Sequence, residues 1–341
     1  MITELVVADI GGTHARFALA QIEDGRVLQL GEALTLKTAE HAGLVEAWQA
    51  FAQNLGRPLP RAAALAFAYP VENDLPELTN MPWTIDARTL PEALGLAQHL
   101  ILNDFCAIGH ATATLGSSHF LHIAGPDIAL PESGVISIVG PGTGLGVGLV
   151  IRRDGQYQVI ASEGGNMDFS PHDDLDDRLM AALRNLYGHV SAERLVSGPA
   201  LRDIYAVIAD AEAPYANDRD LWQAALEGND PTAAAALERF CLCLGAFAGN
   251  IALAQGANAL VVAGGLGLRL REHLPASGFA ERLTAKGEYR SIMEQLPVKL
   301  IAHLEPGLYG AAAAFAARFA GSAPPAEVAG PGRNAPSSQQ G

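Results

Sequence analysis

Residues 5–20 read LVVADIGGTHARFALA, and this stretch decides the fold class of the chain. Two apolar runs flank a centre that contains an aspartate, two glycines, a threonine, a histidine and an arginine. Apolar runs of this length bounded by glycine predict two buried strands, over residues 4–10 and 15–21. The loop that joins them is either an ordinary hairpin turn or a place where the backbone approaches a phosphate group.

The same pattern returns later in the chain. Residues 134–154 read GVISIVGPGTGLGVGLVIRRD, which is again a strand, a loop rich in glycine and threonine, and a second strand. A separation of roughly 125 residues is far longer than a solenoid period, so the repeat predicts two similar lobes rather than an array. Two lobes imply a cleft between them.

The remaining sequence alternates strand and helix patterns, which predicts an α/β plan. The expected strands lie at 62–67, 98–102 and within 257–263, and the expected helices lie at 43–55, after residue 104, through much of 172–255, and at 306–321. Residues 321–341 are rich in Pro, Ala, Gly, Ser and Gln without an apolar period, and we expect them to form a disordered tail.

Composition limits the possible partners and compartments. The chain has 341 residues, 49% of them hydrophobic, and a formal charge of -15, which disfavours nucleic acid and anionic membrane surfaces as partners. Its three cysteines, Cys106, Cys241 and Cys243, form no disulfide framework, and we expect the last two to be packing residues. We expect no signal peptide and no membrane span, and therefore a cytoplasmic protein.

Both glycine loops suit phosphate binding, because a loop without Cβ atoms lets backbone N–H groups approach a ligand closely. The alternative is that both are simply tight turns. Neither loop fits a P-loop or a dinucleotide-binding Rossmann signature, which leaves a two-lobed fold that grips phosphates between paired hairpins. The candidate phosphate-binding residues are Gly11, Gly12 and Thr13 in the first loop, and Gly142, Thr143 and Gly144 in the second.

Asp9 ends the first strand of the pair. In a two-lobed nucleotide fold its carboxylate would face Mg²⁺ through water, since magnesium keeps much of its hydration and takes few carboxylates. The alternative is a structural Asx-type hydrogen bond ahead of Gly11 and Gly12.

Six segments, taken in order, resemble the bacterial glucokinases of the hexokinase, actin and Hsp70 superfamily. They are DIGGTHARFA (9–18), LNDF (102–105), GPGTGLGVG (140–148), SEGGNMDFSP (162–171), GHVSAERLVSGPAL (188–201) and VVAGG (261–265). The resemblance implies an actin-like, ribonuclease H-like fold with duplicated domains around a hinged cleft, and ATP-dependent phosphorylation of the 6-hydroxyl of glucose. It also implies a small domain from residues 1–107 plus 305–320, a large domain from 108–304, and a homodimer.

The resemblance also implies roles for single residues. Asp104 would be the catalytic base, and Gly264 and Gly265 would lie beside the adenosine of ATP. The implied sugar contacts are Asn80, Asn103, Glu163, Asn166 and Glu193. Asn166 stands where the family usually has histidine, a departure that bears on selectivity among hexoses. His14 stands where relatives often have asparagine, a milder variation in the first phosphate loop.

The chemistry of these residue types fits the implied roles. Phosphoryl transfer needs a group that takes the hydroxyl proton, and Asp104 follows a predicted strand at the expected cleft. Its alternative role is the N-cap of the next helix. Glu163 and Glu193 could each accept hydrogen bonds from sugar hydroxyls, or could serve only a turn and a helix start. We expect the acidic run HDDLDDR (172–178) to be a solvated helix start without a chemical role.

Two other functions stay open at this point. The chain could phosphorylate another hexose or an amino sugar, such as mannose, fructose or N-acetylglucosamine. It could also be a sugar-binding regulator without catalysis, although the presence of Asp104 disfavours that interpretation.

Overall fold

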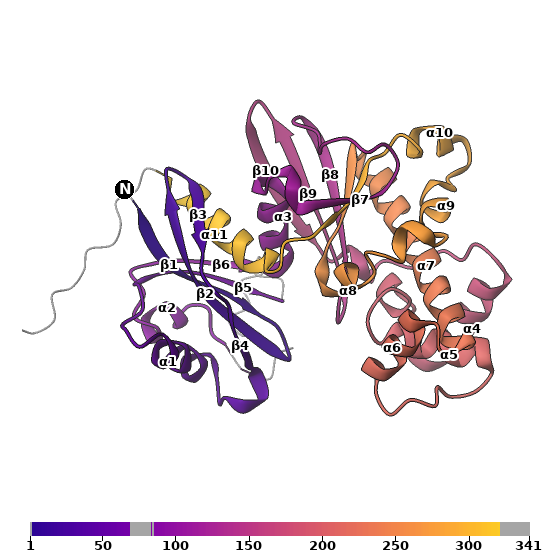
Figure 1. The fold of residues 1–341 in the computed structure, drawn as a ribbon, viewed down its shortest axis with the longest axis horizontal. Coiled ribbons are helices and arrows are strands. Elements are labelled where there is room, and N and C mark those ends of the chain that lie inside the picture. The colour runs from indigo at the N-terminus through magenta and orange to yellow at the C-terminus, as the bar shows by residue number, and fades with distance from the viewer. Residues whose placement is uncertain (1, 69–82, 84, 321–341) are drawn as a thin grey trace, which may run out of the picture.

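The computed structural model describes residues 2–68, 83 and 85–320, and its framework is two six-stranded mixed sheets (Figure 1). Asn80 and the predicted tail, 321–341, therefore lie outside the described residues. The first sheet has the order β3-β2-β1-β5-β6, with β4 paired to β2. Its strands are β1 (Thr3–Ile10), β2 (His14–Glu23), β3 (Arg26–Leu30), β4 (Leu34–Lys37), β5 (Ala62–Phe67) and β6 (Gln98–Asn103).

The second sheet repeats this plan. Its order is β10-β9-β8-β11-β12-β7, and its strands are β7 (Phe120–Ala124), β8 (Gly134–Pro141), β9 (Leu145–Arg153), β10 (Gln156–Ser162), β11 (Ala259–Val262) and β12 (Val298–Ile301). In each sheet an antiparallel hairpin, β1–β2 or β8–β9, is followed by two parallel strands, β5 and β6 or β11 and β12. The predicted duplication is confirmed for these five-strand cores, while among the described residues β4 and β7 have no counterpart in the other sheet.

Helices cover both faces of the first sheet. On one face lies α1 (Leu44–Leu55), whose buried residues Trp48 and Phe51 pack against Phe17 of β2. On the other face lies α11 (Pro306–Arg318), whose alanine-rich surface packs with Leu308 and Phe315 against β1 and β5. The short helix α2 (Leu90–Ala93) adds Leu90 to the α1 side. The last helix among the described residues thus completes the core of the first sheet.

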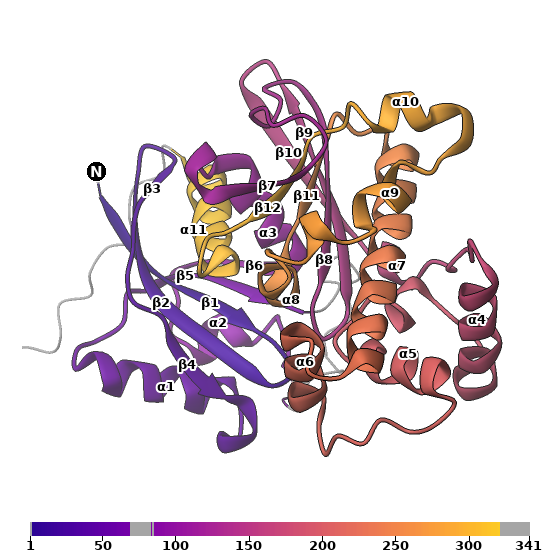
Figure 2. The ribbon, with the colours of Figure 1, turned by 45° about the vertical axis from the view of Figure 1, so that its right-hand side comes forward.

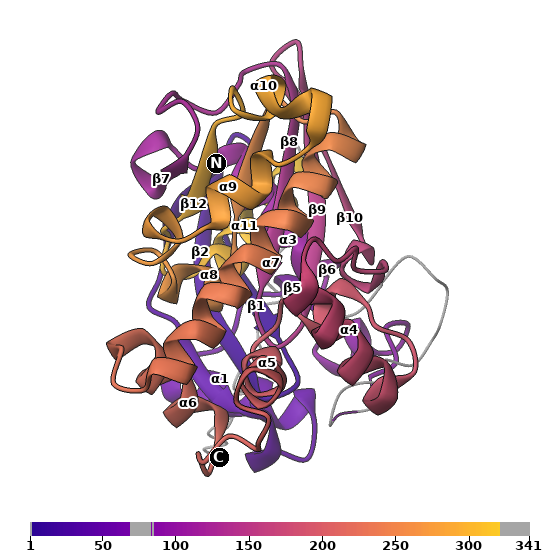
Figure 3. The same cartoon turned by 90° about the vertical axis from the view of Figure 1, so that its right-hand side faces the viewer.

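The second sheet carries a larger helical layer on one face (Figure 3). The longest of its helices, α7 (Pro231–Gln255), is long and apolar enough to span a membrane by length and composition, but 72% of its most apolar window is buried inside the protein. It includes Cys241 and Cys243, both fully buried, as expected of packing residues. The other helices of this lobe are α4 (Asp174–Tyr187), α5 (Ala200–Ala209), α6 (Asp218–Glu227), α8 (Gly264–Arg269), α9 (Phe279–Thr284) and α10 (Arg290–Met293).

Helix α3 (Asp104–Thr114) lies between the two sheets and next to α11 (Figures 1 and 2). Its residue Ala107 belongs to the core formed by the first sheet and α11, whereas Ile108 and Ala111 pack against β8 of the second sheet. The helix that follows Asn103 is therefore the element through which the two halves meet.

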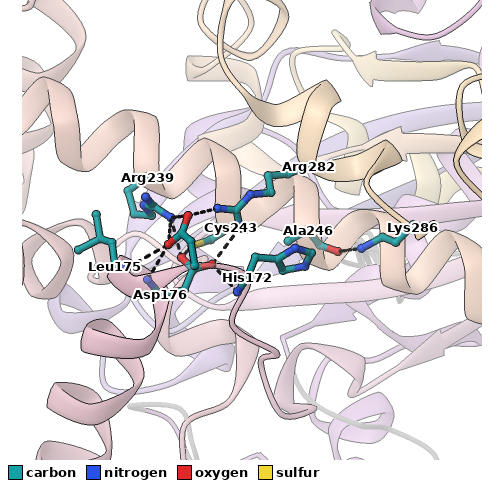
Figure 4. Close-up of polar contacts among 9 residues, drawn as sticks. His172, Leu175, Asp176, Arg239, Cys243, Ala246, Arg282 and Lys286 are labelled. Carbon is teal, nitrogen blue, oxygen red and sulfur yellow. Dashed lines mark hydrogen bonds and ion pairs between the residues drawn. The ribbon is translucent and has the colours of Figure 1, made fainter.

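The acidic run 172–178 starts a helix, as expected, but it is not wholly solvated, and that part of the prediction is wrong. Asp173 caps α4 by accepting hydrogen bonds from the Leu175 and Asp176 N–H groups, and Asp176 is fully buried. Asp176 accepts from Arg239 of α7 and Arg282 of α9, at 2.9 Å each, and both arginines also contact Asp173 (Figure 4). Burial alone would raise the pKa of Asp173, but these contacts hold it at about 2. The run ties three helices together.

Candidate active site

A cavity of about 940 Å³ lies where the ends of the two hairpins face each other. Both predicted phosphate loops line it, together with the start of α3, the end of β10, the start of α8 and the segment that leads into α11. Thirteen of the predicted site residues line this cavity: Asp9, Gly11, Gly12, Thr13, Asn103, Asp104, Gly142, Thr143, Gly144, Glu163, Glu193, Gly264 and Gly265. Residues far apart in the sequence thus meet at one site.

Thr38 stabilises the first loop through two hydrogen bonds. The Thr38 hydroxyl donates to the Gly12 carbonyl at 2.7 Å, and the Thr38 N–H donates to the Thr13 carbonyl at 3.0 Å. The Gly11 N–H donates to the His14 carbonyl and so closes its own turn. Thr38 thus binds two consecutive carbonyls of the loop, which fixes the course of the loop backbone.

Asp9 and Arg16 stand opposite each other on β1 and β2, at the base of the first loop. The Arg16 Nη1 lies 3.2 Å from Asp9 Oδ2, and its Nε lies 3.8 Å from Glu305 Oε2. Burial raises the pKa of Asp9, and the charge of Arg16 opposes that rise. Arg16 was not predicted as a site residue, although the hairpin register places opposite charges directly across from each other and would have indicated the pair.

The second loop is joined to Glu193. The Leu145 N–H donates to Glu193 Oε2 at 2.9 Å, and a Cβ on Gly144 would lie only 2.5 Å from the same oxygen. The Gly142 N–H closes its own turn on the Gly144 carbonyl, and the Gly142 carbonyl accepts from Gly198. Glu193 belongs to a single 3₁₀ turn, Ala192–Arg194, so its carboxylate supports the loop as well as facing the cavity.

Asp104 is the first residue of α3, and Asn103 is the N-cap. The Asn103 side chain accepts hydrogen bonds from the Phe105 and Cys106 N–H groups, which is the capping role that the sequence left open for Asp104. The Asp104 carboxylate accepts one bond from the Phe105 N–H at 2.8 Å. Burial, followed by the negative charges of Asp9 and Glu163, raises the pKa of Asp104 to about 7. A carboxylate with that pKa can take a proton near neutral pH.

The cavity is acidic. Among the described residues that line it, five carboxylates (Asp9, Asp104, Glu163, Glu193 and Glu305) face the single guanidinium of Arg16. A triphosphate would enter this field more favourably with a divalent cation, and Mg²⁺ prefers oxygen ligands, few carboxylates and retained water. Asp9, a partly buried carboxylate beside the first loop, fits that preference.

One predicted sugar contact is not among the described residues that line the cavity. Asn166 is exposed at the end of a 3₁₀ turn, Gly164–Asn166, that begins directly after Glu163. Asn80 lies outside the described residues. Phe105, His303, Leu304 and Glu305 line the cavity and were not predicted; Phe105 alone carried a signal, as the apolar residue directly after Asp104.

Comparison with known proteins relates this arrangement to a family. The sequence profile described as Glucokinase matches residues 6–318. A glucokinase of Zymomonas mobilis is 54% identical over 319 residues, which make up 93% of this chain and 98% of that protein. A glucokinase of Yersinia pestis is 34% identical over 318 residues, or 92% and 96% of the two chains.

This chain belongs to the glucokinase family. The crystal structure of a glucokinase from an Antarctic psychrotroph superposes with a TM-score of 0.77 at 32% identity, covering 92% of this chain and 98% of the other. The family resemblance and the actin-like fold expected from the sequence are both confirmed. Every residue that lines the cavity falls within the range that the glucokinase profile matches.

Proposed function

We propose that this chain transfers the γ-phosphoryl group of ATP to the 6-hydroxyl of D-glucose, giving glucose 6-phosphate and ADP. The observation that carries the proposal is the meeting of the two glycine hairpins and Asp104 in one cavity. The relatives that span nearly the whole chain are glucokinases, which supports glucose as the acceptor.

The reaction needs a base for the sugar hydroxyl. Asp104 takes the proton from the 6-hydroxyl as that oxygen bonds to the γ-phosphorus, and the bond from phosphorus to the β,γ-bridging oxygen breaks to release ADP. The raised pKa of Asp104, about 7, matches a base that works near neutral pH.

Both loops provide donor groups for the phosphates. Gly11 and Gly142 use their N–H groups within their own turns, so Gly12 and Thr13 in one loop, and Thr143 and Gly144 in the other, are the donors assigned to the phosphates. Arg16 supplies the positive charge beside them.

The other ligands occupy the rest of the cavity. Mg²⁺, held by Asp9 through water, would neutralise charge on the phosphates. Gly264 and Gly265, at the start of α8, would leave space for the adenosine. Asn103, Glu163 and Glu193 would bind the sugar hydroxyls, with Asn80 and Asn166 as further sugar contacts.

The wider organisation is part of the same proposal. We assign residues 1–107 plus 305–320 to a small domain and 108–304 to a large domain, hinged around the cavity. We also assign a homodimer, as the resemblance to glucokinases implies, and a cytoplasmic location, in line with the acidic composition.

A coupled assay of ADP formation with glucose, mannose, fructose and N-acetylglucosamine tests the proposal. We expect the highest kcat/KM with glucose, and we expect Asp104→Asn to lower kcat by about 10²–10⁴-fold because it removes the general base. A higher kcat/KM with another sugar would replace glucose as the substrate. No turnover with any sugar, together with sugar binding by calorimetry, would favour a non-catalytic regulator.

A further inference from the structure

At the base of the second loop the hairpin has two glycines in place of larger residues, and the space that they leave is called the slot here. Gly140 on β8 and Gly146 on β9 are directly paired across the hairpin, on either side of the loop Gly142–Gly144. The ring of Phe105 fills the slot, since a Cβ on Gly146 would lie 1.9 Å from Phe105 Cε2 and a Cβ on Gly140 would lie 2.3 Å from Phe105 Cζ. An ordinary Cβ never approaches another carbon so closely, so the ring of Phe105 can occupy this position only because both residues are glycine.

Phe105 reaches this slot from the other half of the molecule. It directly follows Asp104, at the junction of β6 in the first sheet and α3. Its N–H donates to Asp104 Oδ1 and to Asn103 Oδ1, at 2.8 Å each. One residue therefore binds the carboxylate of the proposed base through its backbone and contacts the second hairpin through its ring.

We infer that Phe105 is a positioning residue, which fixes the Asp104 carboxylate at a set distance from the second phosphate loop. The inference rests on the proposed function, in which Asp104 accepts the proton while that loop holds the phosphates. A reaction between two bound substrates depends on alignment, and a shift of about 1 Å can lower its rate about 10²-fold. The ring of Phe105 links the two groups whose separation matters.

The same helix offers a matched control. One turn further along α3, a Cβ on Gly109 would lie 2.2 Å from Val159 Cγ1 of β10, so Val159 makes a second close contact between α3 and the second sheet. Val159 does not line the cavity. Its truncation should loosen the packing of α3 without moving the start of the helix.

The experiment compares Phe105→Leu, Phe105→Ala and Val159→Ala by steady-state kinetics and by urea unfolding. We expect both Phe105 variants to lower kcat, by about 10-fold for leucine and about 100-fold for alanine, with the KM values for glucose and ATP within about threefold of the unmodified chain. Val159→Ala should lower the unfolding midpoint but keep kcat within about twofold. If Phe105→Ala does not fold, Phe105→Leu alone is compared with Val159→Ala.

A double variant tests the slot itself. Gly146→Ala should lower kcat because its new methyl group displaces the ring, and Phe105→Ala together with Gly146→Ala should be more active than the product of the two single effects predicts. Additive losses in the double variant would overturn the inference. So would Phe105 variants that lose stability but keep kcat, or that change only a KM, since these results indicate plain packing or direct substrate contact.

The outcome separates this inference from the proposed function. An active unmodified chain with Phe105 variants that behave like Val159→Ala overturns only the inference. An unmodified chain inactive on every sugar overturns both.

Discussion

The pH dependence of turnover is the most direct test of how the cavity acts on Asp104. An ordinary aspartate has a pKa near 3.8, whereas burial and the charges of Asp9 and Glu163 raise that of Asp104 to about 7. A base works only when it is ionised, so its activity is present above the raised pKa and is lost as the pH falls through it. With a pKa of about 7, roughly nine-tenths of the base is ionised at about pH 8 and roughly a tenth at about pH 6.

The value of kcat/KM for glucose should therefore rise about tenfold per pH unit below about pH 7 and level off above about pH 8. The coupled ADP assay measures this profile, at constant ionic strength and with the unfolding of the protein checked at each pH. Varying the solvent viscosity tells whether the chemical step limits kcat/KM across the range.

Glu163→Gln provides the second half of this test. It removes one of the negative charges that raise the pKa of Asp104, so the inflection should move to lower pH even if weaker sugar binding lowers the rate. Asp168→Asn is the control, because it removes the same charge from an exposed side chain of the same loop that does not line the cavity. An inflection near pH 4, or an equal shift in both variants, would refute the reasoning.

Three further predictions concern other parts of the structure. Asp176→Ala should lower the free energy of unfolding in urea by about 3–5 kcal/mol, because it removes the buried carboxylate that two largely buried arginines share and leaves them only Asp173, and a loss below about 1 kcal/mol would contradict this role. Gly310→Ala should lower the melting temperature in calorimetry, because its Cβ would lie 1.8 Å from the Ala107 carbonyl where α11 crosses α3, and an unchanged melting temperature would show that the helices separate at little cost. Arg16→Ala should lower kcat/KM for ATP by about 10–100-fold through loss of charge-assisted hydrogen bonds to phosphate, whereas a changed KM for glucose alone would place Arg16 elsewhere in the mechanism.

The hairpins and the base could be predicted from the sequence because their signals are local. Each glycine loop and its two flanking strands lie within fewer than twenty-five consecutive residues. Asp104 directly follows a predicted strand. The repeat of the hairpin pattern predicted two similar lobes. These features need no knowledge of which distant segments meet.

The features that were missed or wrong depend on distant contacts. Asp176 looked solvated because its partners lie 63 and 106 residues further along the chain, at Arg239 and Arg282. The slot for Phe105 is formed by Gly140 and Gly146, and nothing in the local sequence distinguishes them from the glycines of the loop between them. Acidic and glycine-rich stretches have the same local pattern whether they face water or another part of the protein.

The position of α11 has a consequence for how the chain is made. Strands β1 and β5 leave the ribosome early, yet Leu308 and Phe315, which cover one of their faces, are synthesised near the end. Throughout translation of the second sheet, that apolar face has no covering helix. The nascent chain therefore presents a surface suited to chaperones, and translation that stops before residue 306 would release an incomplete, aggregation-prone product.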